Sequence, residues 1–261
     1  MAHPMTSRLQ QAAWFRRLMT SKFTSGRIAL GEQNAYGIRP EWITIDMAGA
    51  DYNVDFRRHE RLPFPDHSQQ LVYSAHTIEH IDEVTLQHVL NECHRILKPG
   101  GAIRLEAPDV EKAVQSYQRN DRTFLDYFAH EHRDVLVRQR GLPEVYAEDH
   151  IALLGCLSSY MQNNYQVPVL ASRHDVDAKL ASLNLEAFGQ WCVSLQTPSQ
   201  LQTGGHINPI TCEQLQQRLA SVGFKQIVRR QVGETGVAGL RLKNLERPHR
   251  AFCSFYVEAV A

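Results

Sequence analysis

The sequence predicts an α/β protein built on a doubly wound, mostly parallel sheet. The observations that predict it lie in residues 71–108, where an apolar run at 71–73 suits a buried strand. A helix follows with apolar residues at spacings of three and four, and Asp82 can cap its start. Proline and two glycines at 99–101 end that helix, and 102–107 reads as a second strand. Strand, helix, turn and strand form the right-handed crossover unit of a parallel sheet.

The other apolar runs place the remaining strands. The full set of expected strands is 27–30, 42–46, 52–55, 71–75, 102–107, 225–232 and 252–260. Thr211 can cap a helix that ends at Gly223, just before the sixth strand. Between the fifth and sixth strands, 119–199 is polar and carries scattered aromatic residues, which is typical of a helical lid. We therefore expect a sheet domain at 27–118 and 200–261 with a helical insertion at 119–199.

The N-terminal segment, 1–26, is basic and partly apolar. It contains three arginines and a lysine but no acid, together with apolar surface from residues such as Trp14 and Leu18. We expect a helix packed on the edge of the domain with its basic face in water. The alternative is an interfacial helix that rests on anionic lipid.

Composition excludes several classes of function. The 261 residues contain 28 lysines and arginines and 28 aspartates and glutamates, so a general polyanion-binding surface is not indicated and nucleic acid is not an expected partner. No apolar run is long enough to span a membrane, and the N-terminus lacks a signal-peptide core. The five cysteines are scattered and form no C-x-x-C pair, which favours reduced thiols in a cytoplasmic protein.

Four short motifs carry a resemblance to a known family. They are LPF at 62–64, the pair Ser74 and His76, the pair Glu79 and His80, and RILKPGG at 95–101. In this order the motifs resemble the second half of class I S-adenosylmethionine-dependent methyltransferases. The likeness is greatest to the small type 11-like branch often associated with surface polysaccharide and glycan biosynthesis. The resemblance covers about 27–114 and 200–261. It implies a Rossmann-like, seven-stranded methyltransferase sheet, an antiparallel last pair of strands, and S-adenosyl-L-methionine as cofactor.

Asp46 is the strongest candidate for a cofactor contact. It ends the second expected strand, and ligands of doubly wound sheets lie beyond the carboxyl ends of the strands. A carboxylate there can accept hydrogen bonds from ribose hydroxyls, although a helix-cap or turn aspartate is the structural alternative. The resemblance adds Asp55 beside the adenine amino group and Gly31 in the first loop. Its motifs complete the expected cofactor-binding set with Leu62, Ser74 and His76.

The first loop departs from the family pattern. Gly31 is present, but the second glycine expected in this loop is replaced by Gln33 or its neighbours. Glu32 places a negative charge where the resemblance puts the methionyl end of the cofactor, near its carboxylate, its amino group or its sulfonium. A catalytically inactive descendant of the family therefore stays open, since function must be argued from the site and not from the fold.

Two histidines are the candidates for catalysis. His76 lies where the fourth strand ends, and an imidazole can accept a proton near neutral pH, so we predict a base or a substrate-orienting group there. His206, which precedes the helix capped by Thr211, is the second candidate base. The structural alternative for His76 is a histidine that holds the loop. Glu79 and His80 are expected to brace the loop and the start of the helix.

No metal site is predicted. The cluster at 130–132 (HEH), with Asp149 and His150, offers ligand types, but residues two apart on a helix point away from each other. A solvated polar face explains this cluster.

The first functional hypothesis is an O-methyltransferase that acts on a sugar or another polar metabolite. The second is a catalytically inactive methyltransferase-like subunit that binds a partner through the insertion, and the third is an N-methyltransferase. The expected partner is a small-molecule or glycan acceptor, without nucleic acid and without stable membrane insertion. The oligomeric state is left open, with a homodimer as one option.

Overall fold

The computed structural model describes residues 23–33, 41–139, 141–158, 171–202, 205–242, 245–246 and 248–261. Seven strands form one sheet in the order β3-β2-β1-β4-β5-β7-β6, in which only β7 runs antiparallel to its neighbours. The strands are β1 (Arg27–Leu30), β2 (Ile43–Asp46), β3 (Tyr52–Asn53), β4 (Gln69–Ala75), β5 (Leu97–Pro108), β6 (Lys225–Arg230) and β7 (Ser254–Val260). This confirms the predicted Rossmann-like, doubly wound sheet. The expected N-terminal helix at 1–26 falls almost wholly outside the described residues.

The predicted crossover unit is present at the centre of the sheet. β4 and β5 pair in parallel, with Leu71 opposite Ala102 and Ser74 opposite Leu105, and α2 (Glu83–Ile96) connects them. The Asp82 carboxylate caps α2 by accepting a hydrogen bond from the Thr85 amide at 2.7 Å. The expected turn at 99–101 differs from the prediction, because β5 already begins at Leu97. A shift of register separates this first part of β5 from the regular ladder.

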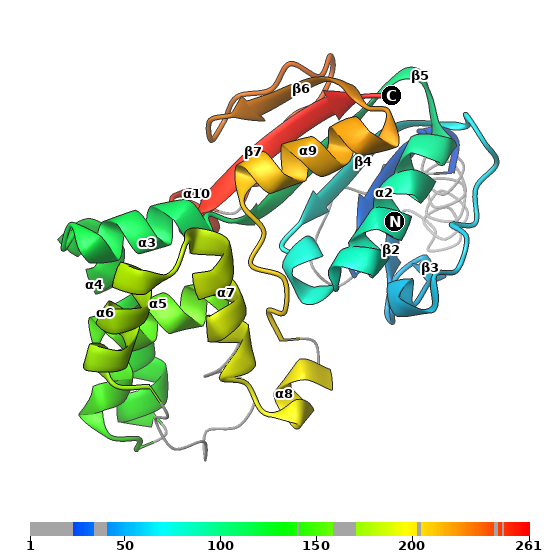
Figure 1. Cartoon of the computed structure of the whole chain (residues 1–261). Coiled ribbons are helices and arrows are strands. Elements are labelled where there is room, and N and C mark those ends of the chain that lie inside the picture. The colour runs from blue at the N-terminus through cyan, green and yellow to red at the C-terminus, as the bar shows by residue number, and fades with distance from the viewer. Residues whose placement is uncertain are drawn as a thin grey trace, which may run out of the picture.

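One face of the sheet is covered by α2 and α9 (Cys212–Val222), which lie side by side across the strands (Figure 1). Alternate residues of each strand point to opposite faces, so Val72 packs beneath these helices while Leu71 and Tyr73 face the other way. On that second face, Trp42 and Tyr73 pack against Leu240 and Leu245. A loop thus covers the part of the sheet where these residues lie.

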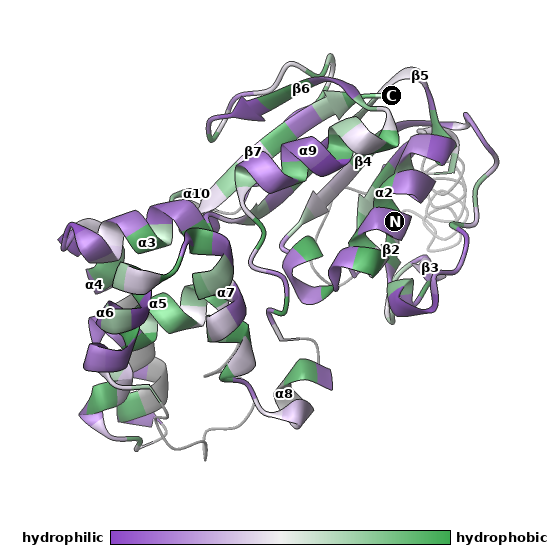
Figure 2. Cartoon of the chain, viewed as in Figure 1, coloured by the Kyte–Doolittle hydropathy of each residue, from purple (hydrophilic) through white to green (hydrophobic). Residues whose placement is uncertain are grey.

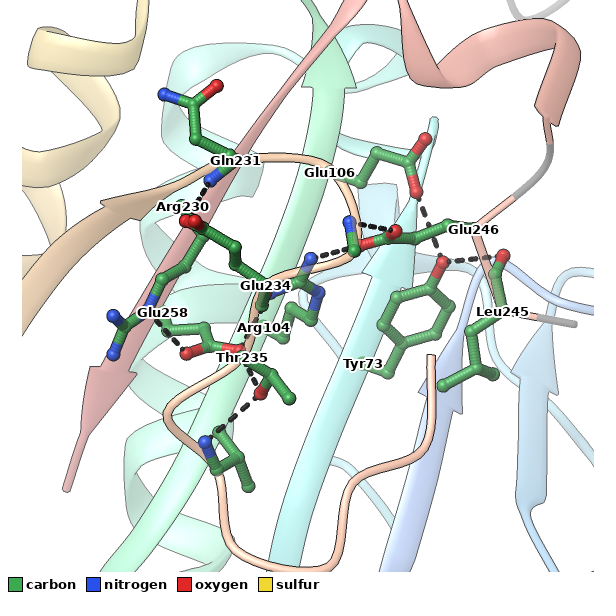
Figure 3. A network of polar contacts seen from close by, with 12 residues as sticks. Tyr73, Arg104, Glu106, Arg230, Gln231, Glu234, Thr235, Leu245, Glu246 and Glu258 are labelled. Atoms are coloured by element: carbon green, nitrogen blue, oxygen red, sulfur yellow. Dashed lines mark hydrogen bonds and ion pairs between the residues drawn. The ribbon is translucent and has the colours of Figure 1, made fainter. Parts of the chain in front are cut away.

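The covering loop spans the described parts of 231–246, and we call it the strap. Arg104 of β5 is fully buried beneath it and pairs with Glu258 of β7 at 2.7 Å and with Glu246 of the strap (Figure 3). The Arg104 guanidinium also donates to the Glu234 carbonyl at 3.0 Å. Buried charges are tolerated only when they are paired. The charged network therefore fixes the strap to the sheet.

A second group of helices, here called the helical lobe, lies at one end of the sheet (Figure 1). Its own core includes Val114, Phe124, Leu154 and Phe188. Figure 2 shows α5 as mostly hydrophobic, which agrees with its burial among the other helices. The lobe comprises α3 (Val110–Gln118), α4 (Arg122–His132), the π-helix η4 (Arg133–Gln139), η5 (Glu144–Ala147), α5 (Asp149–Leu157), α6 (Arg173–Ser182) and α7 (Leu185–Ser194).

Four shorter helices lie in the connections between the longer elements. They are η2 (Phe56–Arg58), η3 (Ile78–His80), α8 (Pro198–Gln202) and α10 (Pro248–Ala251). Within the described ranges, no helix is long and apolar enough to cross a membrane.

We predict that Thr211→Ala destabilises the protein measurably. The Thr211 hydroxyl accepts from the Gln214 amide at 3.2 Å, and the Gln214 side chain accepts from the Thr211 amide at 2.9 Å, so the two residues form a capping box at α9. Losing the cap should lower the free energy of unfolding by about 1 kcal/mol, as measured by urea denaturation. Thr211→Ser keeps the hydroxyl and is the control. Equal stability of the two variants would contradict the capping role.

Candidate functional site

A cavity of about 360 Å³ lies at the carboxyl ends of β1, β2 and β4. Four of the predicted cofactor residues line it, namely Gly31, Asp46, Asp55 and His76. The remaining lining residues are Met47, Phe56, Arg57, Thr77, His80, Ile81 and Gln202. The structure thus brings together residues from the ends of three strands and from α8, which follows the helical lobe in the chain.

Gly31 is required by both its conformation and its neighbours. Its φ of +71° is in the left-handed region that favours glycine, and its amide donates to the Ile45 carbonyl at 2.7 Å. A Cβ at this position would lie 2.0 Å from the Thr77 Oγ1 atom. The absence of a side chain therefore lets β1 turn closely against the end of β4 and leaves backbone on the cavity wall.

Asp46 is the last residue of β2 and is only partly buried. Its Oδ1 atom accepts a hydrogen bond from the Met47 amide at 2.5 Å. Since Asp46 also lines the cavity, its carboxylate is placed to accept hydrogen bonds from a bound molecule.

Asp55 lines the same cavity but already has a partner. Its side chain caps η2, and its two oxygens accept from Nε and Nη2 of Arg57 at 2.9 and 3.0 Å. The hydrogen bond from Arg57 lowers the pKa of Asp55. A contact between Asp55 and an adenine amino group would therefore have to share these oxygens with Arg57.

Leu62 and Ser74 do not line the cavity, in contrast to the expectation from the motifs. The Leu62 side chain packs in the core beneath α2, and its amide donates to the Glu92 carboxylate at 2.7 Å. The Ser74 hydroxyl is buried and donates to the Leu30 carbonyl at 3.2 Å. Leu62 therefore fixes the loop before β4 to α2, and Ser74 ties β4 to β1, so both act outside the cavity wall.

Glu32 is buried and is not among the residues that line the cavity. Its charge acts instead on Tyr73, on the face of the sheet that the strap covers. Burial, together with the charges of Glu106 and Glu32, raises the pKa of Tyr73. Glu32 therefore does not form part of the cavity wall, and its proximity to the methionyl end of a cofactor stays a prediction.

His76 is held on both sides of its ring. Its Nδ1 atom lies 3.2 Å from Glu79 Oε1, and its Nε2 atom lies 2.8 Å from Ser254 Oγ and 3.5 Å from Glu106 Oε1. Burial alone would lower the pKa of His76, but hydrogen bonds to Glu106 and Glu79 outweigh it and raise the pKa to about 9. With both nitrogens engaged, His76 has no free ring nitrogen that could take a proton from a substrate. These contacts favour the structural alternative, a histidine that holds the loop, over a base, and a role of His76 in orienting the substrate stays a prediction.

His206 lies behind His80, as seen from the cavity. The two rings are 4.8 Å apart between centroids at an angle of 70°, and only His80 lines the cavity. His206 and Glu79 line a second, much smaller cavity of about 10 Å³ together with Cys156 and Asn208. Burial lowers the pKa of His206 to about 4. His206 is therefore neutral, but it is separated from the larger cavity by another imidazole.

Several lining residues were missed by reasoning from the sequence. Thr77 directly follows the Ser-x-His motif, and its contact with Gly31 depends on the pairing of β1 with β4. Phe56 and Arg57 follow Asp55, so position in the chain could have indicated them. Gln202 comes from α8, and no signal in the sequence places that helix beside β1 and β2.

Comparison with known families finds a partial match. Residues 33–105 match the model of a methyltransferase domain. The match covers fewer than half of the residues, and it contains Asp46, Asp55, His76 and Glu79. No curated protein matches the chain.

Solved structures with a distant likeness include three methyltransferases. One from Archaeoglobus fulgidus, described as dependent on S-adenosylmethionine, is 12% identical with a TM-score of 0.39, over 97% of this chain and 94% of that one. One from Mesorhizobium loti, described likewise, is 14% identical with a TM-score of 0.41, over 90% of both chains. A putative methyltransferase of Haloferax volcanii in complex with the activator Trm112 is 13% identical with a TM-score of 0.40, over 90% and 81%. These likenesses are too distant to carry an argument about activity.

The cavity fits the cofactor that the methyltransferase match implies, S-adenosylmethionine. Its volume is within the usual range of small-molecule sites, roughly 300–1,000 Å³. A Cβ at Gly31 would collide with Thr77, so the close approach of these two segments in the cavity wall depends on glycine. Asp46 supplies a carboxylate that can accept hydrogen bonds from hydroxyl groups. Met47 and Phe56 supply apolar surface for a flat ring. The chemistry of these residues is therefore consistent with a nucleoside ligand.

Proposed function

We propose that this chain is an S-adenosylmethionine-dependent methyltransferase that acts on a hydroxyl group of a sugar or another polar metabolite. The observation that carries the first part is the cavity at the carboxyl ends of β1, β2 and β4, which has Gly31 and Asp46 in its wall. This is where ligands bind in doubly wound sheets. We also propose a cytoplasmic location, which is supported by five free cysteines, four of them buried.

The residues of the cavity have separate tasks in this proposal. Asp46 accepts hydrogen bonds from the ribose hydroxyls, and Met47 and Phe56 pack against the adenine ring. Gly31 and Thr77 form the wall near the sulfur. The bound cofactor supplies a methyl group that is activated by the positive charge of its sulfur. The protein must hold the acceptor in line with that group, and such positioning contributes roughly 7–11 kcal/mol to catalysis.

The two predicted catalytic histidines take indirect roles. His76 is a positioning residue, because its ring ties η3 to β5 and β7 through Glu79, Glu106 and Ser254. His80 is the imidazole that faces the cavity beside His76, and His206 packs against its ring. A hydroxyl acceptor needs a hydrogen-bond acceptor in the site, and His80 is placed to provide it, with His206 behind it.

Isothermal titration with S-adenosylmethionine and with S-adenosylhomocysteine tests the proposal. We expect one binding site per chain for each ligand. Turnover is then measured as release of S-adenosylhomocysteine with a panel of sugars, phenols and amines. Binding of the cofactor with methylation of amines alone would overturn the assignment of a hydroxyl acceptor.

A second function is favoured by one observation. Asp55, which the resemblance places at the adenine, is occupied by Arg57. In this reading the chain is a catalytically inactive subunit that binds a partner through the helical lobe. The absence of any heat of binding with either ligand would favour it.

We predict that Asp46→Ala weakens S-adenosylhomocysteine binding by more than about tenfold, because each charge-assisted hydrogen bond to a hydroxyl contributes roughly 1.5–3 kcal/mol. The measurement is the dissociation constant from titration calorimetry. Asp126→Ala removes an exposed acid of α4, far along the chain from the cavity, and should bind as the wild type does. Unchanged affinity of Asp46→Ala would contradict the assignment.

A further inference from the structure

Glu79, His80 and His206 form a cluster in which the proposed methyltransferase reaction gives a direct role to His80 alone, as a hydrogen-bond acceptor. One ligand atom from each residue lies within 4.8 Å of the other two. We propose that these three residues bind a divalent transition-metal ion of the zinc type. The proposal rests on the contacts of the cluster and does not depend on the proposed function.

Glu79 has the properties of a carboxylate that awaits a ligand. Its side chain is 97% buried, since only 3% of its surface is exposed. Its Oε1 atom faces His76 Nδ1 at 3.2 Å, while its Oε2 atom is buried and has no hydrogen-bond partner. A buried carboxylate oxygen without a partner is costly. A metal ion bound to Oε2 would remove that cost, and the contact with His76 would orient the carboxylate from behind.

His80 contributes an imidazole beside this carboxylate. Its Nε2 atom lies 3.8 Å from Glu79 Oε1, and its Nδ1 atom is buried without a hydrogen-bond partner. Each nitrogen is thus free of a strong hydrogen bond. The ring can therefore direct a lone pair at an ion that Glu79 also contacts.

His206 completes the set from a distant part of the chain. Its Nδ1 atom lies 3.4 Å from the Cys156 carbonyl. A histidine that binds a metal usually donates its other ring N–H to a carbonyl or carboxylate, and this contact would orient Nε2 towards the cluster. The three residues thus provide both the ligand atoms and the outer contacts of a metal site.

The backbone holds the two halves of the cluster together. The amides of Ile207 and Asn208 donate to the Glu79 carbonyl at 2.8 and 3.1 Å. These bonds fix the segment before α9 against η3 and place His206 next to His80. In a tetrahedral zinc site with metal–ligand bonds of 2.0–2.1 Å, two ligand atoms lie about 3.3 Å apart. The ligand atoms here are up to 4.8 Å apart, so they would have to move closer together by about 1.5 Å when the ion binds.

The donor set defines the class of ion. Two imidazoles and one carboxylate suit zinc and the neighbouring first-row divalent ions, whereas magnesium and calcium prefer oxygen ligands. Three protein ligands leave a fourth position for water or a substrate oxygen, as in catalytic zinc sites. Because His80 also lines the 360 Å³ cavity, the ion would lie next to the space that the cofactor is proposed to occupy.

The test is isothermal titration calorimetry, in which zinc chloride is added to the tag-free chain after treatment with a chelator. We expect one ion per chain and a rise in Tm with zinc. Cobalt chloride is a second probe, and the visible absorption of bound cobalt reports the coordination. His80→Gln and His206→Gln should each weaken zinc binding by roughly 100-fold or more, since even loss of an outer contact costs 10- to 100-fold.

The control uses a second histidine pair. His59 and His88 have ring centroids 5.1 Å apart, but within the part of the chain that the structure describes they belong to no group of three possible metal ligands. His88→Gln should keep the zinc affinity of the wild type. Glu79→Gln is a third variant, which changes the carboxylate ligand but keeps the shape of the side chain. Circular dichroism shows whether each variant is folded.

Two outcomes would overturn the proposal. One is a wild-type chain that binds no zinc, and the other is unchanged affinity in folded His80→Gln and His206→Gln. If S-adenosylhomocysteine binds while zinc does not, only the metal site is rejected. If zinc binds while S-adenosylhomocysteine does not, the proposed function fails and the metal site stands.

Discussion

Arg104→Met is expected to destabilise the protein by about 3–5 kcal/mol, because it removes the guanidinium paired with the buried Glu246 and leaves Glu258 with Arg230 alone. Arg104 is fully buried, and the carboxylates of Glu246 and Glu258 that face it are 7% and 5% exposed (Figure 3). The guanidinium also lies 4.9 Å from the centre of the Tyr256 ring. Methionine can fill much of the volume but cannot neutralise either acid. The measurement is the free energy of unfolding from urea denaturation.

An exposed ion pair provides the matched control for Arg104. Arg61 and Asp66 lie 2.7 Å apart with side chains that are 66% and 55% exposed. Arg61→Met should therefore change the free energy of unfolding by at most about 1 kcal/mol. A loss in Arg104→Met no larger than that of Arg61→Met would show that the strap is held by its apolar contacts and not by the buried charges.

Gly31→Ala is expected to impair both stability and cofactor binding. The left-handed φ of +71° costs a residue with a side chain roughly 1–2 kcal/mol. The new Cβ would also lie 2.0 Å from Thr77 Oγ1, and relieving such overpacking typically costs another 1–3 kcal/mol or so. Thr77 cannot move freely, because its hydroxyl lies within hydrogen-bond distance of the carbonyls of Leu30 and Ala75 and donates to one of them. Shifting it deforms the cavity wall.

Gly100→Ala separates the cost of the left-handed backbone conformation from the cost of the contact with Thr77. Gly100 has a similar φ of +78°, but no atom lies within 4 Å of the position of its Cβ. This variant should lose only the conformational term, about 1–2 kcal/mol, and bind S-adenosylhomocysteine as the wild type does. Equal stability of the two variants in urea denaturation would show that the contact with Thr77 is relieved at no cost.

The strands and the crossover unit followed from local patterns. The patterns are the apolar run at 71–73 and the alternation of Ile103 and Leu105, which each span only a few residues. They report the burial of apolar side chains, and this burial is not directional and so needs no specific partner. Asp46 was predicted for a related reason. It ends a strand of a parallel sheet, and the carboxyl ends of such strands meet at one edge. Position in the strand order was sufficient to place Asp46 at the cavity, whereas Gly31 was predicted from the family resemblance of the first loop.

The partners of the buried charges were decided by the tertiary structure. Arg104 and Glu106 alternate with Ile103 and Leu105, a pattern that by itself is typical of a strand with one face in water. The strap, more than 120 residues further along the chain, buries that face and supplies Glu246. The cluster of Glu79, His80 and His206 likewise needs the backbone bonds between η3 and the segment before α9. Contacts between distant segments depend on how the whole chain packs, and local periodicity carries no information about them.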